Sequence, residues 1–205
     1  LYNNALDILE KLEKTLPKSY GQGWSEILKR KSSTIGNIGL IYSDQGDYLK
    51  ALHQYNQALE IDRELGNKRD IATRFGNIGN VYYYQGTYPK ALHHYNQALE
   101  IKKELGDKMG MATWLGNIGN VYKDHGNYSK ALHHYNYALE IFKELRYKLG
   151  ISTNHGNIGI VYANQGAYSK ALHHYNQALE VDKELGNKSG IASHLGNIGV
   201  IYRRS

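Results

Sequence analysis

The sequence predicts an all-α solenoid, a stack of antiparallel helix pairs. The motif Gly-Asn-Ile-Gly-x-x-Tyr occurs five times at a constant spacing of 40 residues, and its copies begin at Gly36, Gly76, Gly116, Gly156 and Gly196. A sequence period of about 20 to 50 residues is typical of stacked repeats whose units contact only their neighbours. Inside each repeat, apolar residues recur three or four positions apart, which is the spacing of one helix face, and glycines separate two such stretches.

The repeat divides the chain into units of equal length. Four full repeats span 32–71, 72–111, 112–151 and 152–191, and residues 192–205 are expected to form only the first helix of a fifth. Residues 1–31 are predicted to be a degenerate half-repeat and a linker. Residues 2–6 align with residues 48–52, so residues 2–14 are expected to form a second helix that lacks its first. An irregular linker through Pro17 and Gly21 then leads to Trp24, where the repeat register resumes.

The second repeat illustrates how each helix pair is built. Its first helix is predicted over 70–85, and Gly86 ends it because glycine adopts the positive φ of a tight turn at little cost. The second helix begins near Tyr88 and has Pro89 in its first turn, where a missing N–H costs nothing.

The second helices are expected to end at a glycine, as at Gly66, Gly106 and Gly186. The third full repeat has Arg146 and Tyr147 at this place. Its second helix is therefore expected to be less sharply capped.

The small and large residues of each pair resemble a known family. Gly39, Tyr42, Ala51, Tyr55 and Ala58 have the spacing seen in tetratricopeptide repeats, and the following repeats reproduce it. The 40-residue unit resembles the long-helix variety of kinesin light chains and Pins-type proteins. The resemblance covers about residues 32–205 and implies a right-handed superhelix with a concave binding face.

The chain departs from the family pattern at two places. The large aromatic residue early in the first helix is replaced by Ile35, Phe75, Leu115, His155 and Leu195, and the proline near the end of the second helix is absent. Glycines inside a helix cost about 1 kcal/mol each relative to alanine, so a structural need for them is expected. Gly39 matches the close-packing glycine of the family. Gly36 is expected to face the concave side, where a ligand or a neighbouring helix comes near the backbone.

Composition excludes several classes of protein. The 205-residue chain has no cysteine, and therefore no disulfide, thiolate metal site or cysteine nucleophile. This fits a reducing compartment, so a cytoplasmic location is expected. No apolar run approaches the roughly 18 residues of a membrane span, and the first residues do not resemble a signal peptide. The net charge of +6 is spread along the repeats, which favours a solvated surface over a nucleic-acid interface.

One asparagine in each motif is the main candidate for function. Asparagine is a mediocre helix former, so propensity does not explain its place inside a helix. In the resembled family this position lines the concave groove and its carboxamide bonds the backbone of a bound peptide. The resemblance therefore implies a peptide-binding asparagine ladder of Asn37, Asn77, Asn117, Asn157 and Asn197. The alternative is that each asparagine bonds a neighbouring helix and only holds the stack.

Neighbouring positions extend the predicted peptide-binding face. Asn80 and Asn120 continue the polar stripe one turn on, and Thr73, Thr113 and Thr153 lie one turn earlier. Specificity is expected at positions that vary between repeats, among them Tyr83, Tyr84, Lys123 and Arg203. The carboxylate-clamp subtype of the family has lysine where this chain has Gly36, Gly76 and Gly116, so that subtype is not expected.

Metal binding and catalysis find no support in the sequence. Adjacent residues of a helix point about 100° apart, so the histidine pairs 93–94, 133–134 and 173–174 cannot each chelate one ion; they are expected on the outer surface of the second helices. The Gly-x-x-Gly elements lack the preceding strand and the Lys-Ser/Thr of a phosphate loop. No nucleophile, base and orienting group form a set. Neither an enzyme activity, a metal nor another cofactor is predicted.

The leading hypothesis is a protein–protein interaction scaffold whose concave face holds a peptide or segment of a partner protein. A second hypothesis is self-association through the terminal half-repeats, where Leu6, Leu9 and Leu12 stand at one end and Ile198 and Ile201 at the other. Such a head-to-tail contact gives filaments or rings. A third hypothesis, binding of single-stranded RNA, is disfavoured because RNA-reading helical repeats are shorter and this chain has no basic stripe. Neither nucleic acid nor a membrane is an expected partner.

Overall fold

The computed structural model describes residues 2–15 and 21–203, and every secondary-structure element in these ranges is an α-helix. The prediction of an all-α helical repeat solenoid is confirmed. Pro17, in the predicted linker, lies outside the described residues. The helices are α1 (Tyr2–Thr15), α2 (Gln22–Asp44), α3 (Tyr48–Glu64), α4 (Lys68–Tyr84), α5 (Tyr88–Glu104), α6 (Lys108–Asp124), α7 (Tyr128–Glu144), α8 (Lys148–Asn164), α9 (Tyr168–Leu185) and α10 (Lys188–Tyr202).

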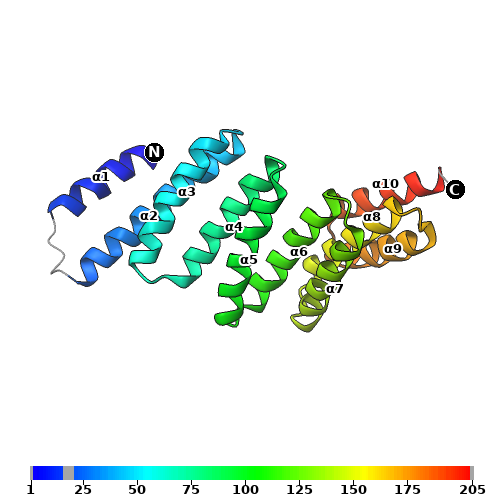
Figure 1. The fold of residues 1–205 in the computed structure, drawn as a ribbon. Helices are drawn as coiled ribbons and strands as arrows, with labels where there is room; N and C mark the ends of the chain where they lie inside the picture. Colours follow the sequence, from blue (N-terminus) through cyan, green and yellow to red (C-terminus); the bar gives the residue numbers. More distant parts are fainter. Residues whose placement is uncertain (1, 16–20, 204–205) are drawn as a thin grey trace. The chain divides into compact units, whose positions relative to one another are not determined.

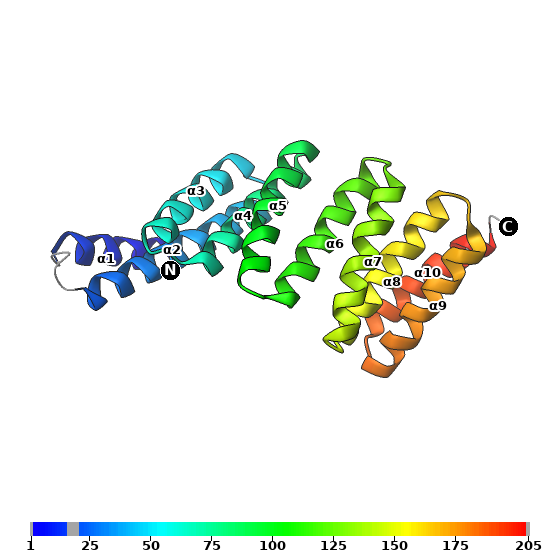
Figure 2. The same cartoon turned by 60° about the horizontal axis from the view of Figure 1, so that its bottom comes forward.

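The chain divides into two compact units, Leu1–Leu105 with α1 to α5 and Gly106–Ser205 with α6 to α10. In the first unit, α2 packs against α3 and α4 against α5 as antiparallel pairs (Figure 1). In the second unit, α6 pairs with α7 and α8 with α9, while α10 packs on α9 (Figure 2). The bounds of α4 differ by at most two residues from the predicted range 70–85, and α5 begins at Tyr88, as predicted.

The core of each pair is a tyrosine that lies against a glycine. Tyr55 and Tyr135 are almost fully buried. A Cβ atom added at Gly39 would lie 2.8 Å from the Tyr55 ring, and one added at Gly119 would lie 2.6 Å from the Tyr135 ring. Both distances are shorter than van der Waals contact, so a side chain at these glycines would push the helices apart. The close-packing role expected for Gly39 is thereby explained by the structure.

The turns are left-handed even where the sequence lacks glycine. Gly66, Gly106 and Gly186 have φ between 63° and 65° at the ends of α3, α5 and α9, and Arg146 adopts φ of 53° at the same place after α7. The expectation of a less sharply capped α7 is therefore wrong, because Arg146 takes up the strained conformation itself. The difference falls on the next helix instead: Tyr147 gives α8 no side-chain cap, whereas the Asn67 side chain accepts a hydrogen bond from the backbone N–H of Asp70.

Candidate functional site

Within each unit, the first helices of neighbouring repeats lie side by side, and we call the surface that they share the first-helix face. In the second unit it consists of α6, α8 and α10, with α8 in contact with both others. Asn117, Asn157 and Asn197 stand on these three helices and are half-buried. In the first unit, Asn37 on α2 is exposed and Asn77 on α4 is half-buried. Among the described residues, we find no hydrogen-bond partner for any of these five carboxamides.

Two pockets open on the first-helix face of the second unit. The α6–α8 pocket has a volume of about 220 Å³, and the predicted site residues that line it are Thr113, Asn117, Asn120, Thr153 and Asn157. The α8–α10 pocket has a volume of about 320 Å³ and is lined by Thr153, Asn157 and Asn197. The structure thus brings six predicted residues together around two adjoining hollows, with Asn157 and Thr153 shared between them.

The first glycine of the motif lets a neighbouring helix approach, as expected. An added Cβ at Gly36 would lie 2.0 Å from Nη1 of Arg74, which comes from the first helix of the next repeat. At Gly156 it would lie 2.7 Å from Cε1 of His194. At Gly116, which lines the α6–α8 pocket, no atom of the described structure lies within 4 Å of that point apart from its chain neighbours and the backbone of its own helix. The same glycine therefore serves packing in two repeats and leaves open space in a third.

Asn80 and Asn120 take part in packing as well as lining the face. Their side-chain oxygens accept hydrogen bonds from the hydroxyl groups of Tyr95, at 2.7 Å, and Tyr135, at 2.6 Å. A carboxamide has both an acceptor oxygen and two donor hydrogens. The tyrosine bond uses the oxygen and orients the amide.

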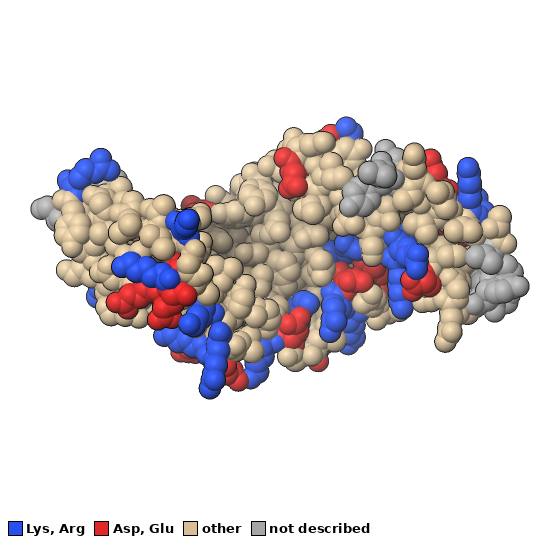
Figure 3. Space-filling model, turned by 180° about the vertical axis from the view of Figure 1, so that it is seen from behind, with Lys and Arg blue, Asp and Glu red and all other residues tan. Residues whose placement is uncertain are grey.

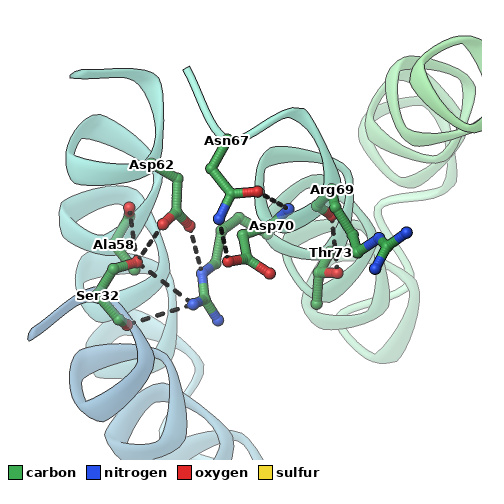
Figure 4. A network of polar contacts seen from close by, with 8 residues as sticks. Ser32, Ala58, Asp62, Asn67, Arg69, Asp70 and Thr73 are labelled. Carbon is green, nitrogen blue, oxygen red and sulfur yellow. Dashed lines mark hydrogen bonds and ion pairs between the residues drawn. The ribbon is translucent and has the colours of Figure 1, made fainter. Parts of the chain in front are cut away.

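The threonines one turn earlier direct their hydroxyl hydrogens back to their own helices. Thr73 donates to the backbone carbonyl of Arg69 at 3.1 Å, as Figure 4 shows. Thr113 and Thr153 donate in the same way to Met109 and Leu149, both at 2.9 Å. These hydroxyls retain only acceptor capacity for a ligand.

The positions expected to determine specificity lie at or just beyond the C-terminal ends of first helices. Tyr83 is half-buried beside Tyr84 and Tyr88, with ring centroids 5.5 and 6.2 Å away. Tyr84 is 64% exposed. Lys123 forms an ion pair of 3.1 Å with Asp124, and Arg203 is exposed directly after α10. Neither Lys123 nor Arg203 lines one of the two pockets, so the structure does not bring these residues together with the asparagines.

A buried polar network that the sequence analysis missed joins neighbouring repeats in the first unit. Nε of Arg74 donates to Oδ2 of Asp62 at 3.0 Å. The Ser32 hydroxyl donates to Oδ1 of Asp62 at 2.6 Å, as Figure 4 shows. Nη2 of Arg74 also lies 3.3 Å from both the backbone oxygen and the hydroxyl of Ser32. All three residues are buried.

The signal that could have revealed this network is a correlation between positions. Serine at position 32 occurs with aspartate 30 residues later and a basic residue 42 residues later, and the set Ser152, Asp182 and His194 repeats it. The repeats that begin with Ala72 and Ala112 instead have Lys102 and Phe142 at the aspartate position. The three positions change together because they are in contact.

The histidine pairs are only partly on the outer surface. His93, His133 and His173 are exposed, as expected. The second member of each pair is half-buried and stacks on a tyrosine of the first helix, with centroids 5.4 to 5.5 Å apart: His94 on Tyr82, His134 on Tyr122 and His174 on Tyr162. The expectation was wrong for these three, because the 100° step between neighbours turns one ring inward. The described residues contain no cluster of three potential metal ligands.

The surface carries charges of both signs. On the face seen in Figure 3, basic and acidic side chains lie beside one another rather than in separate areas. This agrees with the spread of charge along the repeats. No described helix combines the length and the apolar character needed to cross a bilayer.

The two ends differ from the pattern on which the self-association hypothesis rests. Ile201 is only 2% exposed because it packs on Ala171 and Tyr175 of α9, and Ile198 is half-buried beside it. The expectation of apolar surface at Ile201 is therefore wrong. At the other end Leu12 is exposed, and Leu9 and Leu12 line a pocket of about 850 Å³ against α2.

Comparisons with known proteins agree with this geometry. The family model described as "Tetratricopeptide repeat" matches residues 30–104, 70–144 and 150–205, which together cover more than half of the chain. No curated protein matches the sequence.

Several solved structures share the fold at low sequence identity. BtubC (BKLC) from P. vanneervenii has a TM-score of 0.80 and 19% identity, with 98% of this chain and 80% of that chain covered. The apo form of RapI has a TM-score of 0.79 and 24% identity over 98% of this chain and 54% of that chain. A Rap protein complexed with Competence and Sporulation Factor has a TM-score of 0.70 and 20% identity over 96% and 52%. The chain thus spans about half the length of these two Rap proteins.

Proposed function

Since this chain belongs to the tetratricopeptide repeat family, we propose that it is a protein–protein interaction scaffold that holds an extended segment of a partner along its first-helix face. The asparagine ladder would grip the backbone of that segment. The observation that carries the proposal is the set of equivalent, partly exposed carboxamides with no hydrogen-bond partner among the described residues, three of which border adjoining pockets in the second unit.

The chemistry of the ladder suits a peptide backbone. Each residue of an extended chain presents one N–H donor and one carbonyl acceptor, and a carboxamide can pair with both. Neighbouring packed helices lie about 8 to 10 Å apart, and an extended chain advances about 3.3 Å per residue. One asparagine per repeat would therefore meet about every third residue of the bound segment.

The pockets between these contacts would take side chains of the segment. The α6–α8 pocket combines the polar residues Asn117 and Asn120 with Phe142, Tyr147 and Leu149. This mixture of apolar walls and a few polar groups is typical of sites that bind a side chain and fix its orientation. Such a role needs no catalytic group, and the absence of cysteine is consistent with a cytoplasmic setting.

A selection experiment tests the proposal. Random 12-residue peptides displayed on phage would be selected on the chain, and the affinity of the best peptide measured by fluorescence polarisation. Replacing Asn77, Asn117 and Asn157 by alanine should lower that affinity at least tenfold while helicity and melting stay unchanged. The matched control replaces Asn56, Asn96 and Asn136, which are exposed on second helices, and should leave the affinity unchanged. Equal losses in both triple variants, or none in the first, would show that the ladder does not bind the segment.

Self-association remains a second candidate, now supported at one end only. Ile8 and Leu12 are exposed and border the large pocket between α1 and α2, so a second copy could cover them. Sedimentation equilibrium over a hundredfold range of concentration tests this. A constant monomer mass would exclude it, whereas a mass that rises with concentration in the native chain and not in Leu12→Lys would support it.

A further inference from the structure

The α8–α10 pocket contains a buried carboxylate that is only partly satisfied. Asp182, at the end of α9, is 1% exposed, and its Oδ1 accepts a hydrogen bond from Nδ2 of Asn187 at 3.0 Å. Its Oδ2 receives no hydrogen bond from the described residues. Nε2 of His194 lies 3.1 Å from this oxygen, within the distance of an ion pair, but is not aligned to donate to it. A buried carboxylate oxygen without a donor is unfavourable, so a donor supplied by a ligand would be bound there.

The rest of the pocket offers further polar groups. His194 is 8% exposed, and its Nδ1 also lacks a hydrogen-bond partner in the part of the chain that the structure describes. The hydroxyl of Ser152 lies 3.4 Å from Nε2 of the same ring. Asn157 and Asn197 line the same hollow from α8 and α10. The pocket therefore presents one carboxylate and several oxygen acceptors, and the described residues that line it include no lysine or arginine.

The first unit shows what kind of group fits such a set. There the guanidinium of Arg74 donates to Asp62 and to Ser32 and lies directly beside Gly36. Position 194 is the equivalent of position 74, and Ser152, Asp182 and Gly156 are the equivalents of its three neighbours. The second unit keeps the acceptors but replaces arginine by the shorter histidine. Among the described residues, no guanidinium takes the place of Arg74 beside this carboxylate.

We propose that the α8–α10 pocket binds the guanidinium of an arginine side chain in the bound segment. This proposal rests on the proposed function, since the pocket opens on the first-helix face. Oδ2 of Asp182 accepts from the guanidinium, and the side-chain oxygens of Ser152, Asn157 and Asn197 are available for its remaining N–H groups. A guanidinium presents five donors in a planar fork, whereas the ammonium of lysine is a compact point charge with three, so arginine is preferred. The arginine of the partner would pair with the carboxylate of Asp182 as Arg74 pairs with that of Asp62 within the chain.

An NMR titration with N-acetyl-arginine amide tests this assignment. At low ionic strength the probe should shift the backbone amides of Asn187 and Gly190 saturably, and N-acetyl-norleucine amide should not. Asp182→Asn keeps an acceptor for Asn187 but removes the charge, and should weaken binding at least tenfold. Glu184→Gln is the matched control: it removes one negative charge from the same helix, where Glu184 is exposed and paired with Lys148 at 3.0 Å. It should change the affinity less than twofold.

A second variant keeps the test decisive if Asp182→Asn does not fold. His194→Arg restores the residue of the first unit, and its own guanidinium should fill the pocket and abolish binding of the probe. Undiminished binding to His194→Arg would overturn the proposal, as would equal losses in the Asp182 and Glu184 variants. Equally tight binding of N-acetyl-lysine amide would overturn the preference for a guanidinium, and tighter binding of free arginine would assign the pocket to the amino acid instead of a protein segment.

The failure of this inference is separable from a failure of the proposed function. If the phage-selected peptide depends on the asparagine ladder but the arginine probe does not bind, the scaffold function stands and the arginine pocket is wrong. If the probe binds through Asp182 while the selected peptide is indifferent to the ladder, the pocket stands and the proposed mode of peptide binding is wrong.

Discussion

Arg74 and Asp62 form an ion pair across the boundary between two repeats, with 3.0 Å between Nε and Oδ2 and with the carboxylate almost completely buried. The guanidinium also reaches Ser32 in the preceding first helix, so one side chain connects α2, α3 and α4. The first glycine of the motif makes room for it. Ser32, Asp62 and Arg74, at positions that vary between repeats, thus form one connected network.

Removing one partner of this pair should be costly. Asp62→Ala leaves the buried guanidinium without its counter-ion, and such changes typically destabilise by about 3 to 5 kcal/mol. The exposed pair of Lys68 and Glu104 provides the control, since Glu104→Ala should cost about 0 to 1 kcal/mol. The free energies of unfolding from urea denaturation check both values. Equal effects in the two variants would mean that the buried pair does not hold the interface.

Two glycines of one helix should respond in opposite ways to alanine. Gly119→Ala in α6 forces a Cβ to within 2.6 Å of the Tyr135 ring, so we expect a loss of about 1 to 3 kcal/mol. Gly116→Ala meets no atom within 4 Å, and the higher helix propensity of alanine should stabilise α6 by about 0.5 to 1 kcal/mol. Melting temperatures of the two variants measure the difference. A stabilising Gly119→Ala would contradict the close-packing role of this glycine.

The parts of the fold that depend on the repeat period could be predicted from the sequence. The helix pairs, the breaks at Gly86 and Gly106 and the approach of another helix at Gly36 all follow from residue types that recur at fixed spacing. The partner at Gly36 could not be predicted in this way, since Arg74 stands at a position that varies. The contacts of Arg74 depend on the residues that the preceding repeat carries at positions 32 and 62.

Part of the candidate site could also be predicted from the sequence. The repeat places Asn117 and Asn157 on one face, and the structure puts both beside the α6–α8 pocket. The sequence does not show that the hydroxyl of Tyr135 donates a hydrogen bond to Asn120, because that bond depends on the distance between α6 and α7. The sequence also does not show which of His93 and His94 is turned toward the first helix, since packing sets the rotation of a helix about its axis.

Arg146 should be replaceable by glycine with a gain in stability. Its φ of 53° lies in the left-handed region, which costs a residue with a side chain about 1 to 2 kcal/mol. Glycine loses more backbone entropy on folding, which offsets part of this gain, so we expect Arg146→Gly to stabilise by about 0.5 to 1 kcal/mol. Thermal unfolding of the variant and of the original chain gives the comparison. A lower melting temperature would mean that the arginine side chain makes a compensating contact.

Acid should destabilise the second unit through His155 and His174. Their Nδ1 atoms lie 3.0 Å apart, so one ring must donate and the other must be neutral to accept. Burial, together with the positive charge of His174 and Lys143, lowers the pKa of His155 to about 4. In the unfolded chain histidine has a pKa of about 6.5, so between these values the unfolded state binds more protons than the folded one.

The resulting stability is fully present above pH 6.5 and is lost as the pH falls toward 4. At pH 5 the loss due to His155 alone should be about 2 kcal/mol relative to pH 7.5. His155→Leu introduces the residue found at the equivalent positions 115 and 195, and it should reduce the decline of melting temperature between pH 7.5 and 5. Part of the decline should persist, because burial also lowers the pKa of His134 and of His94. An unchanged pH profile in His155→Leu would show that this ring titrates normally in the folded chain.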